Sequence, residues 1–527
     1  MWFARFLSDN TTAMRRVFFI TLFSLGIVAC SKKSGNTSMQ SLNDLQEWVC
    51  PLYTLKGELV WNEIHKNTAH MQTGMYADPY TKQYYTTRQP LVWLTREGIS
   101  LQADTLLTFL ANVEEEGFSP TSFQLDSIQK LLRRARELNF EETDANKLLG
   151  KLEFLLTQAY LRYACGQRFG YIHPRRIFNN LLIDPPAEGE KRTYVIYRQL
   201  YDHASEEVSD SFIHHAIEQV KTHRISGFLR EIQPTDTIFR QIKAEYQRAK
   251  QQGDTARTRL ARINLERARW RYPHPNKGKY IFVNLAEQEL TAVDTDCDTA
   301  LTMHVCCGNS THKTPLLHSE VKYVELNPYW VIPQTIVRKE IVPRHVGDSA
   351  YFARNNYHAI HKETKEEVDP TLLTSAELRS AQYTLRQEKG VGNSLGRIIF
   401  RFPNNFSVYL HDTNNQSAFQ KANRAISHGC VRVQKPLDLL LFLLDNPSAF
   451  YIDRIRMSID LPPLTLAGRI YQQNHPDAKP LSSIGLSSSI PVWLDYWTLY
   501  PAPNGTLLTH PDKYEYDEVI EKSLNAF

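Results

Sequence analysis

Residues Ser427 to Val433 read Ser-His-Gly-Cys-Val-Arg-Val, and the thiol of Cys430 within them is the chain's strongest candidate for covalent chemistry. A second histidine, His411, lies nineteen positions earlier, at the end of an alternating apolar run. Thiolate is the reactive form of cysteine, and an imidazole within reach can take the thiol proton. A lone cysteine is otherwise a small buried hydrophobe. The neighbours of Cys430 therefore favour a nucleophile for acyl transfer.

The choice of base depends on strand alternation. Residues 405–413 read Asn-Phe-Ser-Val-Tyr-Leu-His-Asp-Thr, which predicts a strand with Tyr409 and His411 on its polar face. His428 stands close to the thiol in sequence and competes for the same role. Because neighbouring residues on an extended chain point to opposite faces, the pattern favours His411 as base. It leaves His428 as a group that orders the loop or contacts substrate.

The elements around the thiol are predicted from the same run. Cys430 and Arg432 alternate with two valines, which places the thiol and the guanidinium on one face and the valines in the core. Gly429 permits a backbone turn closed to other residues, which would aim the amides around Cys430 at an oxyanion. One such donor contributes roughly 3 kcal/mol. The leucines after Pro436 predict a helix with proline in its first turn.

At these residues the chain resembles a known family. A histidine, fifteen residues and then Ser-His-Gly-Cys is similar to the YkuD-type L,D-transpeptidases of the bacterial cell wall. From about residue 90 onward, further segments resemble the large, YcbB-like subgroup: Asn264-Leu-Glu-Arg-Ala-Arg-Trp270, Val283-Asn284, Thr314-Pro315, Asn327-Pro-Tyr-Trp-Val-Ile-Pro333, Arg386-Gln387, Asn393-Ser-Leu-Gly-Arg397, Phe402-Pro-Asn404, Tyr409-Leu-His-Asp-Thr413, and Ile490-Pro-Val492 with Tyr496.

The resemblance implies a mechanism and its residues. In that family a thiolate attacks the carbonyl of the third residue of a tetrapeptide stem, releases D-alanine and leaves a thioester that an amine resolves. The resemblance implies Cys430 as nucleophile and His411 as base, an oxyanion hole formed by the amides of Gly429 and Cys430, and a backbone carbonyl at Asp412 that orients the imidazole. It implies 3-3 cross-links between peptidoglycan stems, no cofactor, and covalent labelling by carbapenems.

Further residues are expected to bind the substrate. Ser427 and His428 lie beside the thiol, and the planar fork of Arg432 suits a substrate carboxylate. The alternative for Arg432 is a structural ion pair. Tyr409 and Trp330 either line the groove for the stem peptide or belong to an ordinary aromatic core.

The start of the chain reads as an export signal. Met14-Arg15-Arg16 precedes a short apolar stretch that ends in Ile27-Val-Ala-Cys30, which resembles a lipobox with Cys30 as the acylated residue. The stretch is shorter than the about 20 apolar residues of a comfortable membrane span. These features predict a membrane-anchored periplasmic lipoprotein of a Gram-negative envelope, with an uncleaved anchor or plain secretion as alternatives.

Composition narrows the partners. The net charge of +4 is spread over 527 residues without a basic stripe, which argues against nucleic acid. Lipidation and catalysis would use two of the seven cysteines and leave an odd number, so disulfide connectivity stays open. The seven are Cys30, Cys50, Cys165, Cys297, Cys306, Cys307 and Cys430.

The order of patterns predicts an α+β protein with a helical scaffold and a mainly β catalytic domain. Leucines at helical spacing in 106–113 and 152–163 are core stripes, and the charges of 206–270 predict a solvated helix face or a glycan-facing surface. The expected ranges are a signal peptide at 1–30, a tether and N-terminal segment at 31–90, the scaffold at 91–270, the catalytic domain at 271–480 with a lid at about 334–392, and a tail at 481–527 that packs on the scaffold.

Two further expectations come from the family pattern. The chain runs from Gln251 almost directly into Asn264, so we expect the small peptidoglycan-binding module of many relatives to be absent. The lid carries several histidines, but no His-Glu-x-x-His helix or acidic partner set accompanies them, so no metal site is expected. The lid histidines and tyrosines are His345, Tyr351, Tyr357, His358 and His361.

Three functions remain open from the sequence. The first is a transpeptidase, with a carboxypeptidase or a protein-attachment enzyme as variants that differ in the acceptor. The second is a cysteine endopeptidase that opens existing cross-links. The third is a non-catalytic wall-binding lipoprotein, which the Cys430 and His411 pair argues against.

Overall fold

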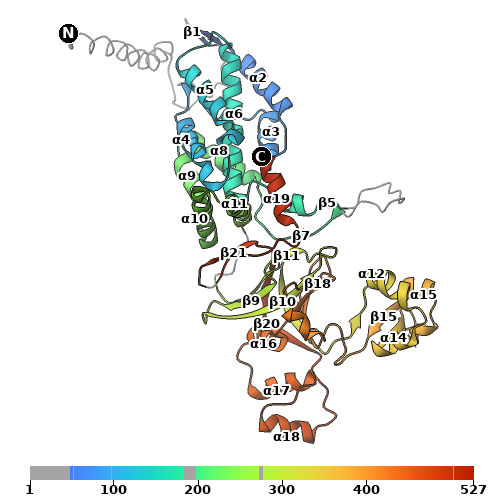
Figure 1. Ribbon diagram of the computed structural model, residues 1–527. Helices are drawn as coiled ribbons and strands as arrows, with labels where there is room; N and C mark the ends of the chain where they lie inside the picture. The colour runs from blue at the N-terminus through green and yellow to red at the C-terminus, as the bar shows by residue number, and fades with distance from the viewer. Residues whose placement is uncertain are drawn as a thin grey trace, which may run out of the picture. The chain divides into compact units, whose positions relative to one another are not determined.

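The computed structural model describes residues 48–50, 53–95, 98–182, 197–271, 277–380, 382–502 and 504–526. The chain divides into a first unit that runs to His173, continues at Glu206–Arg271 and resumes at Glu518, and a second unit of Pro174–Ser205 and Tyr272–Asp517. The first unit is helical and the second is mostly β (Figure 1), which confirms the predicted α+β class. The expected signal segment and Cys30 lie outside the described residues.

The first unit consists of helices and two small hairpins. Its helices are α2 (Gly57–His70), α3 (Asp78–Thr86), α4 (Gln102–Ala111), η2 (Val113–Glu116), η3 (Pro120–Phe123), α5 (Leu125–Arg136), α6 (Ala145–Phe169), α8 (Asp210–Lys221), α9 (Ile225–Glu231), α10 (Thr237–Gln252), α11 (Thr255–Arg269) and most of α19 (Tyr516–Asn525). The hairpins pair β1 (Trp48–Cys50) with β2 (Tyr53–Leu55) and β3 (Leu94–Thr95) with β4 (Gly98–Ile99).

Helix α6 is the centre of this unit. The Asp144 side chain accepts from the backbone N–H of Asn146 at 2.9 Å, which caps the first turn, and the helix ends at Gly170 with φ of +95°. Nearly all of its side chains are buried, because other helices of the unit surround it. The stripe predicted at 152–163 therefore forms part of the core.

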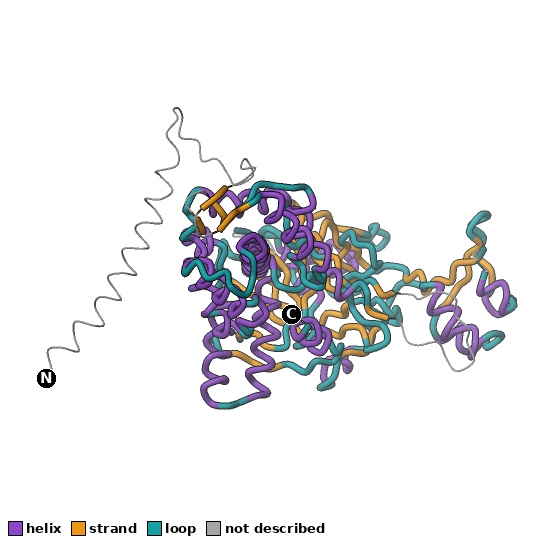
Figure 2. Tube along the Cα trace, turned by 90° about the horizontal axis from the view of Figure 1, so that it is seen from above, coloured by secondary structure: helices purple, strands orange, loops and turns teal. Residues whose placement is uncertain are grey.

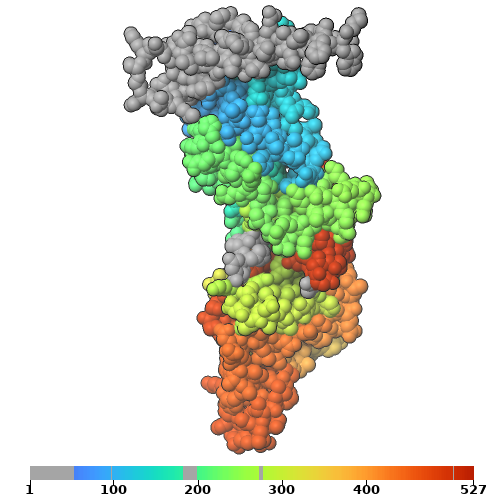
Figure 3. Space-filling model, turned by 90° about the vertical axis from the view of Figure 1, so that its left-hand side faces the viewer, coloured from blue at the N-terminus to red at the C-terminus, as the bar shows by residue number. Residues whose placement is uncertain are grey.

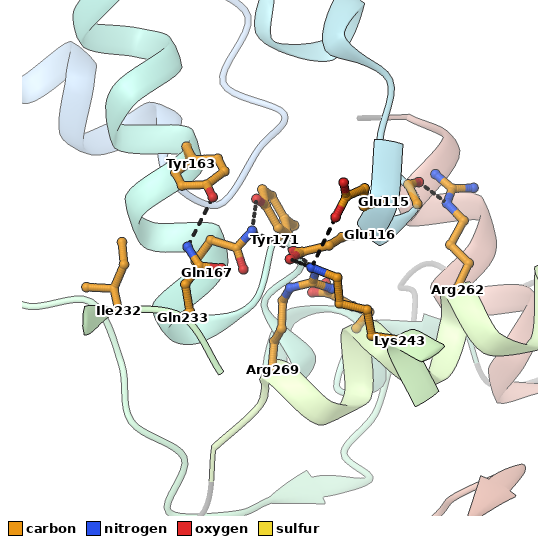
Figure 4. Close-up of polar contacts among 12 residues, drawn as sticks. Glu115, Glu116, Tyr163, Gln167, Tyr171, Ile232, Gln233, Lys243, Arg262 and Arg269 are labelled. Carbon is orange, nitrogen blue, oxygen red and sulfur yellow. Dashed lines mark hydrogen bonds and ion pairs between the residues drawn. The ribbon is translucent and has the colours of Figure 1, made fainter. Parts of the chain in front are cut away.

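The expected solvated face on 206–270 is wrong at the end of α11. Glu266 and Arg269 are fully buried, and Arg269 donates to Glu116 at 2.8 Å (Figure 4). Lys243 also donates to Glu116, at 2.8 Å, and three aromatic rings surround the Arg269 guanidinium. Burial alone would raise the pKa of Glu116, but Arg269 and Lys243 together lower it to about 2. Acidic partners thus allow an arginine to enter the core, which a charge pattern alone does not reveal.

The second unit is built on a ten-stranded sheet. Its strands are β7 (Tyr201–Asp202), β8 (Lys279–Asn284), β9 (Glu289–Asp294), β10 (Thr299–Gly308), β11 (Leu316–Leu326), β16 (Ile398–Arg401), β17 (Leu410–His411), β18 (Ala425–Ser427), β19 (Val431–Val433) and β20 (Ser483–Asp495). Smaller elements are α7 (Pro174–Phe178), the pair β5 (Leu181–Leu182) and β6 (Tyr197–Arg198), η6 (Gln416–Gln420), and the pair β21 (Leu499–Pro501) and β22 (Leu507–Thr509).

Most strands of this sheet form a closed ring. The order β16-β17-β19-β10-β9-β8-β20-β11 returns to β16 through the β11–β16 pairing, so the path forms a ring. Alternate residues of the ring fill its apolar side, among them Val431 and Val433, which are fully buried as predicted. Helices α16 (Pro436–Leu443), α17 (Ala449–Ser458) and α18 (Leu466–Asn474) follow β19, with Pro436 in the first turn as expected, and form the orange projection of Figure 3.

Residues Trp330 to Gln387 form a small body beside the ring, here called the lid (Figures 1 and 2). Its sheet has the order β12 (Trp330–Val331), β15 (Tyr383–Gln387), β13 (Tyr357–His361) and β14 (Glu367–Val368). Its short helices are α12 (Gln334–Ile336), η4 (Val337–Ile341), α13 (Val342–His345), α14 (Ser349–Arg354), η5 (Pro370–Leu372) and α15 (Ser375–Arg379). These elements share an apolar core of their own, around Val337, Phe352 and Ala359.

Several observed boundaries differ from the expected ranges. Helices α2 and α3 already belong to the first unit, and residues 174–205 belong to the second. The expected tail at 481–527 is divided, because β20 pairs with both β8 and β11 inside the ring and only the residues from Glu518 onward return to the first unit. Only Gly253 and Asp254 separate α10 from α11.

Within the described ranges, no helix combines the length and the apolar character needed to cross a membrane.

Candidate active site

Strands β17 and β19 bring the predicted thiol and base together. They pair in parallel, with Leu410 opposite Val431 and His411 opposite Arg432. Paired residues of neighbouring strands project to the same face, and Cys430 lies two positions before Arg432. Cys430 directly precedes β19, so the pairing of these separate segments places the turn that carries the thiol beside the strand that carries His411.

His411 is buried and neutral. Its side chain is 4% exposed, and its Nδ1 donates to the carbonyl oxygen of Asp412 at 2.5 Å. Burial and the charge of Arg432 lower the pKa of His411 to about 4, although the carbonyls of Asp412 and Leu395 oppose the shift. Because a carbonyl oxygen only accepts, Nδ1 carries the proton, and Nε2 is left as the basic nitrogen.

The predicted strand at 405–413 is reduced to the two residues of β17. The chain turns at Asn405 and Phe406, and Ser407 has φ of +55°. This turn brings the Ser407 carbonyl to the thiol, which donates to it at 3.9 Å. Among the described residues, the thiol makes no hydrogen bond to the imidazole of His411, so the expected direct contact is not formed in this state.

The Cys430 thiol is partly exposed and protonated. Burial raises the pKa of Cys430, while Tyr409, Arg401 and Arg432 favour the thiolate. Tyr409 lies between these groups, with the Arg401 guanidinium 4.5 Å from its ring centre and the His411 ring centre 5.8 Å away. Tyr409 is thus close enough to the thiol to influence its pKa, and its place in a substrate groove stays a prediction.

The turn before the thiol is held by three hydrogen bonds. Gly429 has φ of +121°, which favours glycine. Its N–H donates to Ser427 Oγ at 3.1 Å, the Ser427 hydroxyl donates to the Cys430 carbonyl at 2.5 Å, and the Gly429 carbonyl accepts from Thr314 Oγ1 at 2.8 Å. The Gly429 amide, expected to face an oxyanion, is therefore engaged inside the turn. The Cys430 amide has no acceptor within the described part of the chain.

Arg432 has no carboxylate partner among the described residues. No described residue forms an ion pair with it, and its buried Nε has no hydrogen-bond partner there. The expected alternative of a structural ion pair is therefore not what the structure has. A guanidinium near the thiol whose N–H groups have no partner among the described residues can donate hydrogen bonds to a substrate carboxylate.

His428 connects the turn to the lid. Its Nε2 lies 2.6 Å from Oε1 of Glu340 in η4, and both side chains are about two-fifths exposed, at 41% and 43%. The His312 ring is 5.1 Å from that of His428. This contact corresponds to the loop-ordering one of the two roles expected for His428, and a substrate contact stays a prediction.

Trp330 belongs to the lid and not to the thiol's surroundings. Its backbone pairs with Gln387, and its ring lies edge-on to Tyr357 at 6.5 Å. The side chain packs against the apolar core of the lid. The aromatic-core alternative therefore describes Trp330 in this structure.

Among the described residues, no group of three or more histidine, cysteine or acidic side chains is arranged to hold a metal ion. Cys165, Cys297, Cys306 and Cys307 are free thiols, and Cys50 has no described side chain. In the lid, His345 stacks on Tyr351 and His358 pairs with Glu367. A cavity of about 460 Å³ opens beside Asp412 and the start of α16, but neither Cys430 nor His411 lines it.

The sequence patterns missed three residues that shape the site. Thr314 lies more than a hundred positions before Cys430, and Arg401 lies nearly thirty positions before it. Glu340 comes from the lid. In the sequence, Thr314 stands out only as part of a Thr-Pro pair. A buried hydroxyl and two partly exposed charges carry no periodic signal, so only the fold reveals their partners.

Comparison with known proteins gives a consistent result. Residues 278–451 match the family model of the L,D-transpeptidase catalytic domain, YkuD, and residues 79–245 match that of the Scaffold domain. A Haemophilus influenzae protein named "Putative L,D-transpeptidase" is 30% identical over 241 residues, which is 46% of this chain and 45% of that protein. The chain thus spans about half the length of the curated relative it matches.

Proposed function

We propose that this protein, in which one segment matches the YkuD L,D-transpeptidase catalytic domain and another the Scaffold domain, cross-links peptidoglycan stem peptides through a cysteine thioester. In this proposal Cys430 is the nucleophile and His411 the base. The products are 3-3 linked stems and free D-alanine. No cofactor is required, because the thiol and the imidazole supply the covalent and proton-transfer chemistry.

One observation supports the proposal above all others. The parallel pairing of β17 with β19 brings the turn that carries a partly exposed thiol beside the strand that carries a buried neutral imidazole. The carbonyl of Asp412 fixes the tautomer of that imidazole. A nucleophile, a base and a group that orients the base are the three parts that acyl transfer by cysteine needs.

The resting state determines how the reaction begins. Cys430 is protonated and His411 is neutral, so the pair starts as thiol and imidazole and not as an ion pair. The proton must pass to Nε2 as the sulfur attacks, after the thiol turns from the Ser407 carbonyl toward the ring. Hydrogen bonds of this kind are often long in free enzymes and tighten with substrate.

The proposed reaction takes place in two steps, acylation of the thiol and transfer of the acyl group to an amine. First, a bond forms between Cys430 sulfur and the carbonyl carbon of the third stem residue, the amide bond to D-alanine breaks, and His411 passes the thiol proton to the leaving amine. Second, an amine of another stem attacks the thioester carbon and forms the new amide bond, the carbon–sulfur bond breaks, and His411 takes a proton from the attacking amine and delivers it to the sulfur. Arg432 holds a carboxylate of the stem throughout.

Two other outcomes use the same thioester. Water as acceptor would make the protein an L,D-carboxypeptidase, and attack on an existing cross-link would make it a cysteine endopeptidase. The partly exposed Cys430 is compatible with both of these outcomes, and the product assay described below distinguishes them.

The proposed substrate places the protein outside the cytoplasm. We expect a periplasmic lipoprotein held to a membrane through Cys30, as the Ile-Val-Ala-Cys run suggests. Labelling with a radioactive fatty acid, and its loss in Cys30→Ala, would support this location. Unlabelled wild-type protein would contradict it.

The decisive experiment follows products and the acyl-enzyme by mass spectrometry. Wild-type protein with a disaccharide tetrapeptide should release D-alanine, carry a thioester on Cys430 and form dimers joined through two third-position residues. Cys430→Ala should form neither, and His411→Ala should form a trace or none. Cys297→Ala, which removes an exposed thiol elsewhere, is the matched control and should behave as wild type.

The same assay separates the alternatives. Hydrolysed tripeptide without dimers indicates the carboxypeptidase, and cleavage of added cross-linked dimers indicates the endopeptidase. A carbapenem should add its mass to Cys430 alone. Full product formation by Cys430→Ala would place the chemistry elsewhere in the protein.

A further inference from the structure

The turn that carries the thiol is supported by a residue far from it in sequence. Thr314 lies 115 positions before Gly429, is fully buried, and donates its hydroxyl proton to the Gly429 carbonyl at 2.8 Å. The same oxygen accepts from the N–H of Gly308 at 2.8 Å. A hydroxyl has one proton to donate, so the contact with Gly308 leaves that proton committed to Gly429.

Planarity of the peptide bond transmits this contact to the thiol. The Gly429 carbonyl and the Cys430 N–H belong to one trans peptide unit, in which C=O and N–H point in opposite directions. When Thr314 holds the carbonyl, it therefore also fixes the direction of the Cys430 N–H. That N–H is the amide of the turn without an acceptor among the described residues, since the Gly429 N–H donates to Ser427.

A tyrosine fixes Thr314 in turn. The Tyr514 hydroxyl donates to the Gly308 carbonyl at 2.6 Å and accepts from the Thr314 N–H at 3.1 Å. Tyr514 is 1% exposed, and its own N–H donates to the Tyr496 hydroxyl at 3.0 Å. The Tyr514 hydroxyl thus binds the backbone of Thr314 and the backbone of Gly308, the residue whose N–H donates to the Thr314 hydroxyl.

From this geometry we propose that Thr314 is a positioning residue, backed by Tyr514, that aims the Cys430 N–H as the oxyanion donor of the acyl-transfer step. The inference rests on the proposed function, since it assumes that Cys430 is acylated. Of the two amides expected to form the oxyanion hole, it keeps that of Cys430, because the Gly429 amide donates to Ser427. Neither Thr314 nor Tyr514 touches the substrate.

The test compares two reactions of the same thiol. Acylation by a disaccharide tetrapeptide passes through an oxyanion, whereas alkylation by iodoacetamide displaces iodide at a saturated carbon and needs no such donor. Thr314→Val should slow acylation about 10- to 100-fold, somewhat less than the loss of a whole donor. The rate of alkylation and its pH profile should stay as in wild type.

Conservative and matched variants complete the design. Thr314→Ser keeps the hydroxyl and should recover most of the acylation rate, and Tyr514→Phe should lower acylation several-fold with alkylation unchanged. Thr498→Val removes another buried hydroxyl, one that donates to Asp517, and should leave both rates unchanged. If Thr314→Val fails to fold, Thr314→Ser and Tyr514→Phe decide the question.

Three results would overturn the inference. The first is full acylation by Thr314→Val or, where that variant does not fold, by Tyr514→Phe. The second is a parallel loss of acylation and alkylation, which indicates a displaced thiol. The third is no recovery in Thr314→Ser. Failure of the proposed function is visible separately, because Cys430→Ala would then still form product.

Discussion

Arg432 lies directly opposite His411 across the parallel pair of β17 and β19, and its charge adds to burial in keeping the imidazole neutral. The two side chains share one face with the thiol. A cation in this place has two effects, since it lowers the pKa of the base and favours the thiolate of Cys430. The arrangement favours a base that is unprotonated at neutral pH.

Arg432→Met should move the acid side of the pH–rate profile upward. Without the guanidinium charge, the pKa of His411 rises from about 4 toward its usual value, so protonation disables the base at higher pH. The measurement is the rate of acylation by the tetrapeptide from pH 4.5 to 8, scaled to each plateau. Arg456→Met on α17 is the control. An unchanged acid limb would show that Arg432 does not act on His411.

His411 should also make stability depend on pH. Its folded-state pKa of about 4 lies below the unfolded value near 6.5, so the unfolded chain binds the proton more readily. The stability of the second unit is therefore complete above about pH 6.5 and declines as pH falls toward 4, by up to about 3 kcal/mol. In urea unfolding, His411→Gln should decline less over this window. Equal declines in both proteins would contradict a buried neutral imidazole.

Gly429→Ala should lower acylation because of backbone conformation. The φ of +121° is unfavourable for alanine, although a β-carbon there would meet only Val408 at 4.0 Å. We expect a stability loss of about 1–3 kcal/mol and a large loss of acylation as the turn shifts. Gly390→Ala is the matched control, with φ of +109° and open space around it, and should lose stability without loss of acylation. Wild-type acylation by Gly429→Ala would contradict the role of the turn.

The pair of His428 and Glu340 should matter for substrate binding more than for chemistry. Both side chains are exposed enough that the pair is worth about 0–1 kcal/mol of stability. His428→Ala and Glu340→Ala should therefore raise KM more than they lower kcat, since each loosens the contact between lid and turn. Glu367→Ala, which breaks a pair within the lid, serves as control. A loss of kcat in His428→Ala as large as in His411→Ala would reopen the choice of base.

The buried charges of the first unit should dominate its stability. Glu116→Gln leaves Arg269 with only Glu266 at 3.8 Å, and we expect a loss of about 3 kcal/mol or more. Because the folded pKa of Glu116 is about 2, its contribution is complete above the unfolded value and fades as pH falls toward 2. Glu115→Gln breaks only the exposed pair with Lys243 and should cost less than about 1 kcal/mol. Similar losses in both variants, seen in thermal unfolding, would contradict this difference.

Features that depend on neighbouring residues could be predicted from the amino-acid sequence alone. Helical spacing of leucines gave α6, proline followed by leucines gave α16, and alternation put Val431 and Val433 in the core. The Ser-His-Gly-Cys run pointed to the thiol for the same reason, since the chemical types lie within a few residues of one another. Periodicity and local spacing are properties of the chain before it folds.

The tertiary structure decided which separate segments meet. The parallel register of β17 with β19, the burial of Arg269 beside Glu116, and the contact of Thr314 with Gly429 each join residues far apart in sequence. The turn at Ser407 shortened the predicted strand, and the Ser427 hydroxyl took the Gly429 amide. The pKa of His411 likewise depends on burial and on a charge from another strand. Such contacts arise from the packing of the whole chain, and no local pattern specifies the partner of a buried polar group.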